Sequence, residues 1–136
     1  MDAQKPYFKV AAHGLIQKDG KFLVTRRSAV NDYMPNLWDI PGGTVEFDEN
    51  IYQCLEREID EESKLKVKIN KAIFVHDYLS NEFRHQFQIV YTCDYQSGEV
   101  TLNPQEHDDF KWVTLDELES LPKIAFLDEL FKFLKN

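Results

Sequence analysis

Hydrophobic positions along the chain follow two different periods. A strand-like pattern of apolar residues occurs in five segments: 7–17, 21–25, 65–78, 86–95 and 110–113. It is clearest in the fourth segment, where every odd-numbered residue from Phe87 to Tyr95 is apolar or aromatic. Asp19-Gly20 separates the first two segments and predicts a tight hairpin turn.

Helical spacing appears in three places. Ile51, Leu55 and Ile59 recur every four residues, and Asp48 is the expected N-cap of this helix. Residues 114–117 read Thr-Leu-Asp-Glu, a capping box that predicts a short helix ending at Pro122, and 124–134 form an amphipathic helix. Strands interleaved with three helices predict an α/β (α+β) fold, in which a mixed central sheet carries helices on both faces. The length of 136 residues predicts a single domain, 1–136.

The segment between Gly43 and Leu65 is unusually acidic. It crowds eight carboxylates into seventeen positions with only Arg57 to oppose them: Glu46, Asp48, Glu49, Glu56, Glu58, Asp60, Glu61 and Glu62. Like charges at this density repel one another, and a bound cation would relieve the repulsion.

The placement of these acids on the helix favours metal binding over a solvated acidic face. With Leu55 at zero on a helical wheel, Glu62 falls at about −20° and Glu58 at about −60°. Glu62 therefore points inward, where an unpaired carboxylate is costly, and the acids lie at the helix C-terminus, which disfavours negative charge. Hard divalent cations prefer such oxygen ligands.

The spacing of the segment resembles a known signature. Gly43, five residues, Glu49, seven residues and then Arg57-Glu58-Ile59-Asp60-Glu61-Glu62 match the box of the Nudix hydrolases, G-x5-E-x7-R-E-U-x-E-E-x-G-U. Lys64 replaces the final glycine, which affects the geometry of the helix end but leaves every metal ligand in place. The resemblance implies an α/β/α sandwich and metal-dependent hydrolysis of a diphosphate linkage with Mg²⁺ or Mn²⁺.

The resemblance also implies roles for individual residues. Glu58 and Glu62 would be the central metal ligands, with Glu61 and the carbonyl of Gly43 as further ligands. Glu49 and Arg57 would form a salt bridge that positions the ligands, and Glu46 matches an acidic position of the loop. Glu106 would be an extra metal ligand or general base; a solvated loop residue is the alternative. The expected catalytic residues are thus Glu58, Glu61, Glu62 and Glu106.

Four residues are candidates for substrate binding. Arg26 and Arg27 end a predicted strand, where the guanidinium fork could bind phosphate, although surface charge is the alternative. Trp38 could stack on a base, as could Tyr33, with core packing as the alternative for Trp38. The four histidines show no metal-ligand spacing and are interpreted as structural; His107 is the one near the proposed site.

Composition limits the partners. The net charge of −8 argues against nonspecific binding to a nucleic-acid duplex or an anionic membrane. Two cysteines make no disulfide framework, and residues 1–5 lack a signal-peptide pattern, so a reducing cytoplasm is expected.

We therefore expect an enzyme acting on a small nucleotide, as a monomer or homodimer. The leading hypothesis is hydrolysis of a nucleoside triphosphate, ordinary or modified, to a nucleoside monophosphate and pyrophosphate. The alternatives are ADP-ribose, another nucleotide sugar, a dinucleotide or a capped RNA end. Rivals of another class are a catalytically silent nucleotide sensor, which would lack some glutamates, and an isoprenoid diphosphate isomerase, which would need a cysteine at the diphosphate pocket.

Overall fold

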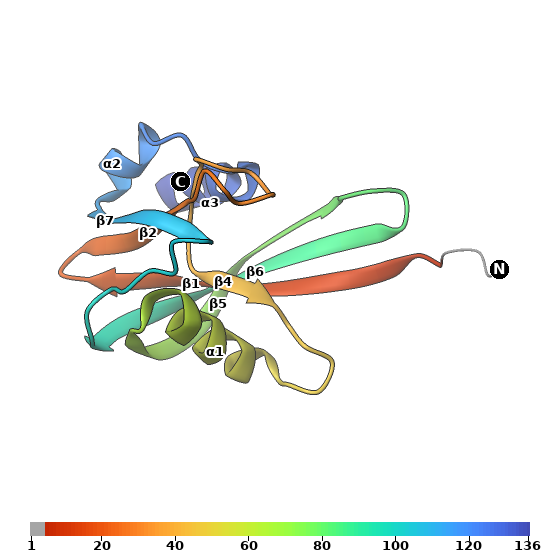
Figure 1. Ribbon diagram of the computed structural model, residues 1–136, viewed down its shortest axis with the longest axis horizontal. Helices are drawn as coiled ribbons and strands as arrows, with labels where there is room; N and C mark the ends of the chain where they lie inside the picture. The colour runs from red at the N-terminus through yellow and green to blue at the C-terminus, as the bar shows by residue number, and fades with distance from the viewer. Residues whose placement is uncertain (1–4) are drawn as a thin grey trace.

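Seven strands and three helices make up residues 5–136, the part of the chain that the computed structural model describes (Figure 1). Residues 1–4, on which most of the signal-peptide expectation depends, lie outside the described residues. In chain order the elements are β1 (Tyr7–Lys18), β2 (Lys21–Arg27), β3 (Trp38–Asp39), β4 (Gly42–Thr44), α1 (Ile51–Ser63), β5 (Lys66–Leu79), β6 (Arg84–Ser97), β7 (His107–Val113), α2 (Leu115–Glu119) and α3 (Ala125–Lys135).

The sheet is mixed, as expected. Its strand order is β3-β2-β1-β6-β5, with β4 paired to β1 and β7 paired to β2. Strands β1 and β6 run parallel over residues 7–17 of β1, whereas every other pairing is antiparallel. The alternation pattern does not predict β3 and β4, because strands of two and three residues are too short to show a period. Strand β4 matters for the site, since it places Gly42 and Gly43 beside the middle of β1.

Helices cover both faces of the sheet, which confirms the sandwich (Figure 1). Helix α1 packs on one face, where Leu55 and Ile59 belong to the same core as Cys93 of β6. Helices α2 and α3 pack on the other face, where Leu127 and Leu130 share a core with neighbouring sheet residues. Among residues 5–136, no helix combines the length and apolar character that crossing a bilayer requires.

Helix α1 begins two residues later than the sequence suggests. The N-cap is Asn50 and not Asp48: the Asn50 side chain accepts a hydrogen bond from the backbone of Gln53, whose side chain accepts one from the Asn50 backbone. Asp48 has Ile51 three residues ahead and could not make this reciprocal pair. The expectation for Asp48 was therefore wrong.

Replacing Asn50 by alanine is expected to lower the free energy of unfolding by about 1 kcal/mol, because the backbone N–H of Gln53 loses its hydrogen-bond partner. Asp48→Ala is the matched control and should change stability little. Urea denaturation of the two variants measures the difference; equal losses would contradict the assignment of the cap.

Helix α1 ends without the glycine that the signature calls for. Lys64 adopts the left-handed conformation, with φ of 64°, and its backbone N–H donates to the carbonyl of Asp60. A lysine in this conformation is strained by about 1 kcal/mol relative to glycine. The helix end nevertheless keeps the geometry that a C-terminal glycine would give it, so Glu61 and Glu62 remain in the last regular turn of the helix.

Candidate metal and substrate site

Glu62 is buried at the C-terminal end of α1, as the helical wheel predicts. Its side chain is 9% exposed, and Oε2 accepts a hydrogen bond of 2.7 Å from the backbone N–H of Gly42. Burial raises the pKa of Glu62 well above its usual value; the Gly42 bond opposes this shift, and the charge of Glu58 adds to it. An ionised Glu62 therefore needs a positive partner.

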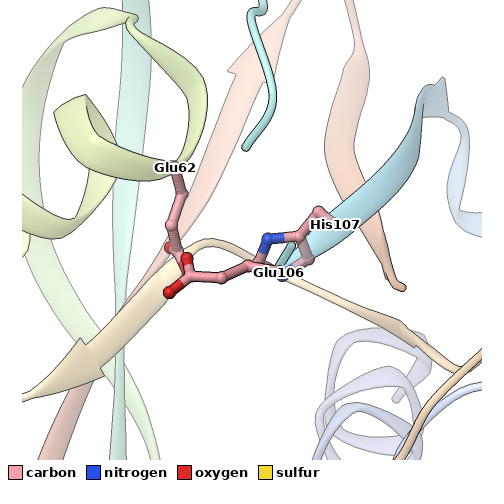
Figure 2. Close-up of side chains that lie close together, drawn as sticks. All are labelled: Glu62, Glu106 and His107. Carbon is pink, nitrogen blue, oxygen red and sulfur yellow. The ribbon is translucent and has the colours of Figure 1, made fainter. Parts of the chain in front are cut away.

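Glu106 and His107 approach Glu62 from the start of β7 (Figure 2). Strand β7 pairs antiparallel with β2, and a shift in register at Arg27 sets His107 opposite that residue. This pairing brings Glu106 and His107 close to Glu62. Each of the three side chains offers an oxygen or nitrogen atom, and these atoms lie within 4.8 Å of one another. Figure 2 shows the carboxylates of Glu62 and Glu106 pointing toward each other. Residues distant in sequence thus converge on one point.

These residues fit a divalent cation. Two carboxylates at this separation repel unless a positive charge lies between them. His107 is 4% exposed, and its Nδ1 has no hydrogen-bond partner among residues 5–136. Burial lowers the pKa of His107, so its imidazole is neutral at physiological pH and supplies no compensating charge to the carboxylates.

Glu58 lies one helical turn before Glu62 and faces Gly43. A side chain built on Gly43 would collide with the Glu58 carboxyl group, so the glycine backbone lies directly against that carboxylate. Burial raises the pKa of Glu58, and the neighbouring Arg57 opposes the shift. The missing side chain at Gly43 therefore makes room for the acid.

Arg57 organises the acidic helix. It pairs with Glu49 at 2.7 Å, which confirms the predicted salt bridge, and with Glu58 at 2.9 Å and Glu61 at 3.4 Å. The hydrogen bonds from Arg57 lower the pKa of Glu49 to about 2. Glu61 does not join the group around Glu62, because its side chain is 56% exposed and is held by Arg57. Glu46 is exposed and contributes its backbone N–H to Glu49.

A cavity of about 560 Å³ opens beside these acids, and Gly42, Gly43 and Glu62 line one end of it. Arg27 also lines the cavity; its guanidinium lies 3.4 Å from Asp39 and donates to the carbonyl of Tyr33. This volume lies within the usual range of small-molecule sites.

Arg26 and Trp38 lie outside the cavity lining. Arg26 pairs with Asp108 at 2.8 Å. Trp38 is 4% exposed and belongs to the core on the α3 side, where the Arg26 guanidinium lies 5.9 Å and the Lys111 amine 5.3 Å from its ring centre. Its burial agrees with core packing, the alternative interpretation, and leaves no accessible face on which a base could stack.

Two residues at the site have no functional role in the predictions from the sequence. Asp39 is 6% exposed, lines the cavity and lies close enough to Glu62 for its charge to raise the Glu62 pKa. His107 was interpreted as structural, and the one available signal was its position next to Glu106. Neither belongs to a periodic pattern, because both are placed by strand pairing.

Comparison with known proteins agrees with this geometry. The model of the NUDIX domain family matches residues 7–134. An ADP-ribose pyrophosphatase of Methanocaldococcus jannaschii is 34% identical over 86% of this chain, which spans 66% of that protein, just under two thirds. A nucleoside triphosphatase NudI of Klebsiella pneumoniae is 28% identical over 78% of this chain and 82% of its own length.

Among solved structures, a MutT protein of Methanosarcina mazei superposes with a TM-score of 0.84 at 25% sequence identity, covering 98% of this chain and 96% of that one. Its fold agrees with the sandwich described above. The family match extends over nearly the whole chain and includes the segment from Gly43 to Glu62. The chain therefore belongs to the Nudix family.

Proposed function

We propose that this protein hydrolyses a diphosphate linkage in a nucleoside diphosphate derivative with the help of Mg²⁺ or Mn²⁺. The observation that carries the proposal is the buried Glu62 carboxylate, which lies beside Glu106 at the end of the cavity. The buried free thiols of Cys54 and Cys93 are consistent with action in the cytoplasm.

Each residue of the site has a proposed role. Glu58 and Glu62 would hold the cations, with the Gly43 carbonyl as a further ligand; Glu61 would join them only by leaving Arg57. Cations bound there would neutralise the phosphate oxygens and lower the pKa of the attacking water. Arg57, fixed by Glu49, holds Glu58 in position. Glu106 would serve either as an extra metal ligand or as the base that accepts the proton of the water. Arg27 is the candidate contact to a substrate phosphate, because it lines the cavity.

Two substrate classes are supported by relatives. A nucleoside triphosphate, cleaved to a monophosphate and pyrophosphate, is the leading candidate, and the similarity to NudI supports it. ADP-ribose is the second candidate, because the archaeal relative is named as an ADP-ribose pyrophosphatase. Both contain the diphosphate that the site would polarise.

A phosphate-release panel tests this function. Nucleoside triphosphates, ADP-ribose and dinucleotides are incubated with the protein in Mg²⁺, Mn²⁺ or chelator. The protein is then filtered off and excess Mg²⁺ is added before the coupling enzyme, a pyrophosphatase for the triphosphates and a phosphatase for the other substrates, releases phosphate. Release is expected only with a divalent cation. Glu58→Gln should lose turnover, whereas Glu56→Gln, an exposed acid on the same helix, should retain it. Release in chelator, or full activity of Glu58→Gln, would refute the proposal.

A further inference from the structure

The cavity has a second, basic end. Lys9 of β1 and Arg84 of β6 line the same cavity as Gly42 and Glu62, the residues of its acidic end. Side chains alternate along a strand, so Lys9 lies on the same face of β1 as His13, and Arg84 on the same face of β6 as Gln88. Both strands continue past the helices in this direction (Figure 1), which leaves the cavity floor longer than the metal site requires.

The strand register gives the distance between the two ends. Gly43 pairs with Ala12 and Gly42 with His13, so Lys9 lies three to four residues away along β1. At about 3.3 Å per residue this corresponds to roughly 10–13 Å. Arg84 pairs with Tyr7 and therefore lies still further from the glycines. The long side chains can shorten this span, and the space that remains suits a nucleoside between two phosphate-bearing ends.

Neither cation has an acidic partner among residues 5–136. Lys9 and Arg84 take part in none of the ion pairs between residues 5 and 136, although the sequence has 24 acidic residues against 16 basic ones. Arg84 donates from Nε to the uncharged hydroxyl of Ser80. Both side chains are half-buried, where an unpaired charge is more costly than at the surface. An anion between them would remove this cost.

Aromatic side chains also line the cavity. Tyr33, Tyr78 and Phe126 line it, and the Phe126 ring lies 4.6 Å from that of His13. Residues Ala125 and Phe126 are the first of α3, whose N-terminus has no side-chain cap, so its free N–H groups add positive potential along the same cavity.

We propose that Lys9 and Arg84 form a subsite for a second phosphate, carried on the 2′ or 3′ position of the substrate's ribose. This inference rests on the proposed function, since it assumes that the diphosphate occupies the acidic end. It narrows the substrate class to nucleotides that bear a ribose phosphate in addition to the scissile diphosphate. Phosphate is a suitable ligand, because guanidinium and ammonium groups together offer it several charge-assisted hydrogen bonds.

Equilibrium binding tests the subsite without turnover. The probes are AMP, adenosine 2′,5′-bisphosphate and adenosine 3′,5′-bisphosphate, measured by calorimetry in Mg²⁺ at fixed ionic strength. At least one bisphosphate should bind tenfold or more tightly than AMP. In the double variant Lys9→Gln/Arg84→Gln the preference should fall below twofold. The matched control Lys68→Gln/Lys71→Gln removes two exposed lysines of β5 outside the cavity lining and should keep the preference.

The outcomes separate the two proposals. Equal affinity of the wild type for all three probes, no binding of any of them, or a preference that survives in the Lys9/Arg84 variant would overturn the subsite. Turnover in the phosphate-release panel would then still support the hydrolase. Conversely, a bisphosphate preference that depends on Lys9 and Arg84, in a protein that releases no phosphate from any substrate, would support the subsite and count against hydrolysis.

Discussion

Glu62→Gln is expected to reduce turnover about 10²–10³-fold while raising the melting temperature in chelator. The activity loss follows because a metal ligand supplies several kcal/mol of charge stabilisation to the transition state. The stability gain follows because glutamine removes a buried charge beside Glu58 and Glu106. Its amide oxygen can still accept the hydrogen bond from Gly42. Activity and stability should therefore change in opposite directions.

The stability difference should depend on pH in a defined direction. The carboxyl group of Glu62 has a raised pKa in the folded protein, whereas an unfolded glutamate has a pKa of about 4.3. Between these values the folded state binds more protons, so the stability of the wild type falls as pH rises through this window. The advantage of Glu62→Gln should thus be absent below about pH 4 and present at pH 7.

Thermal unfolding with and without cations completes this test. Millimolar Mg²⁺ or Mn²⁺ should raise the melting temperature of the wild type, because binding to the folded state alone stabilises it, and should raise that of Glu62→Gln much less. Glu56→Gln removes an exposed charge of the same helix and should respond to cations as the wild type does. The same cation response in wild type and Glu62→Gln would argue against Glu62 as a ligand.

The acidic helix could be predicted from the sequence because its signals are local. Ile51, Leu55 and Ile59 define the buried stripe, and the angle of Glu62 relative to that stripe follows from helical geometry alone. The salt bridge between Glu49 and Arg57 comes from the family spacing. The cap was missed because three polar residues precede the helix. Only the reciprocal bonds of Asn50 and Gln53 distinguish the true cap from Asp48.

Periodicity does not predict the rest of the site, because strand pairing builds it, and Glu106 is expected there only from the family resemblance. Glu106 and His107 reach Glu62 only through the pairing of β7 with β2, and no periodicity encodes that partner. Lys9 and Arg84 line the same cavity because β1 and β6 are parallel neighbours, a pairing that local sequence patterns do not show. The burial of Trp38 likewise depends on α3 packing over it from the far end of the sequence.

Gly43→Ala is expected to lower turnover about 10–100-fold at nearly unchanged stability. The new methyl group would collide with the carboxyl group of Glu58. This group is the far end of a flexible side chain, so it can swing aside at little cost to the fold. A displacement of about 1 Å at a catalytic group can cost up to 10²-fold in rate. Steady-state kinetics with thermal unfolding measures both effects.

Gly42→Ala is the matched substitution, and it is expected to affect stability. In Gly42→Ala the methyl group would meet backbone atoms of Ala12 and His13, which cannot move without disturbing the pairing of β4 with β1. This variant should lose about 1–3 kcal/mol of stability, as is typical of overpacking. If Gly43→Ala instead lost as much stability as Gly42→Ala, or kept full turnover, the close approach of Gly43 to Glu58 would have no catalytic significance. The two substitutions add the same methyl group one residue apart. A loss of turnover confined to Gly43→Ala would therefore show that activity depends on the position of the Glu58 carboxylate and not on the loop as a whole.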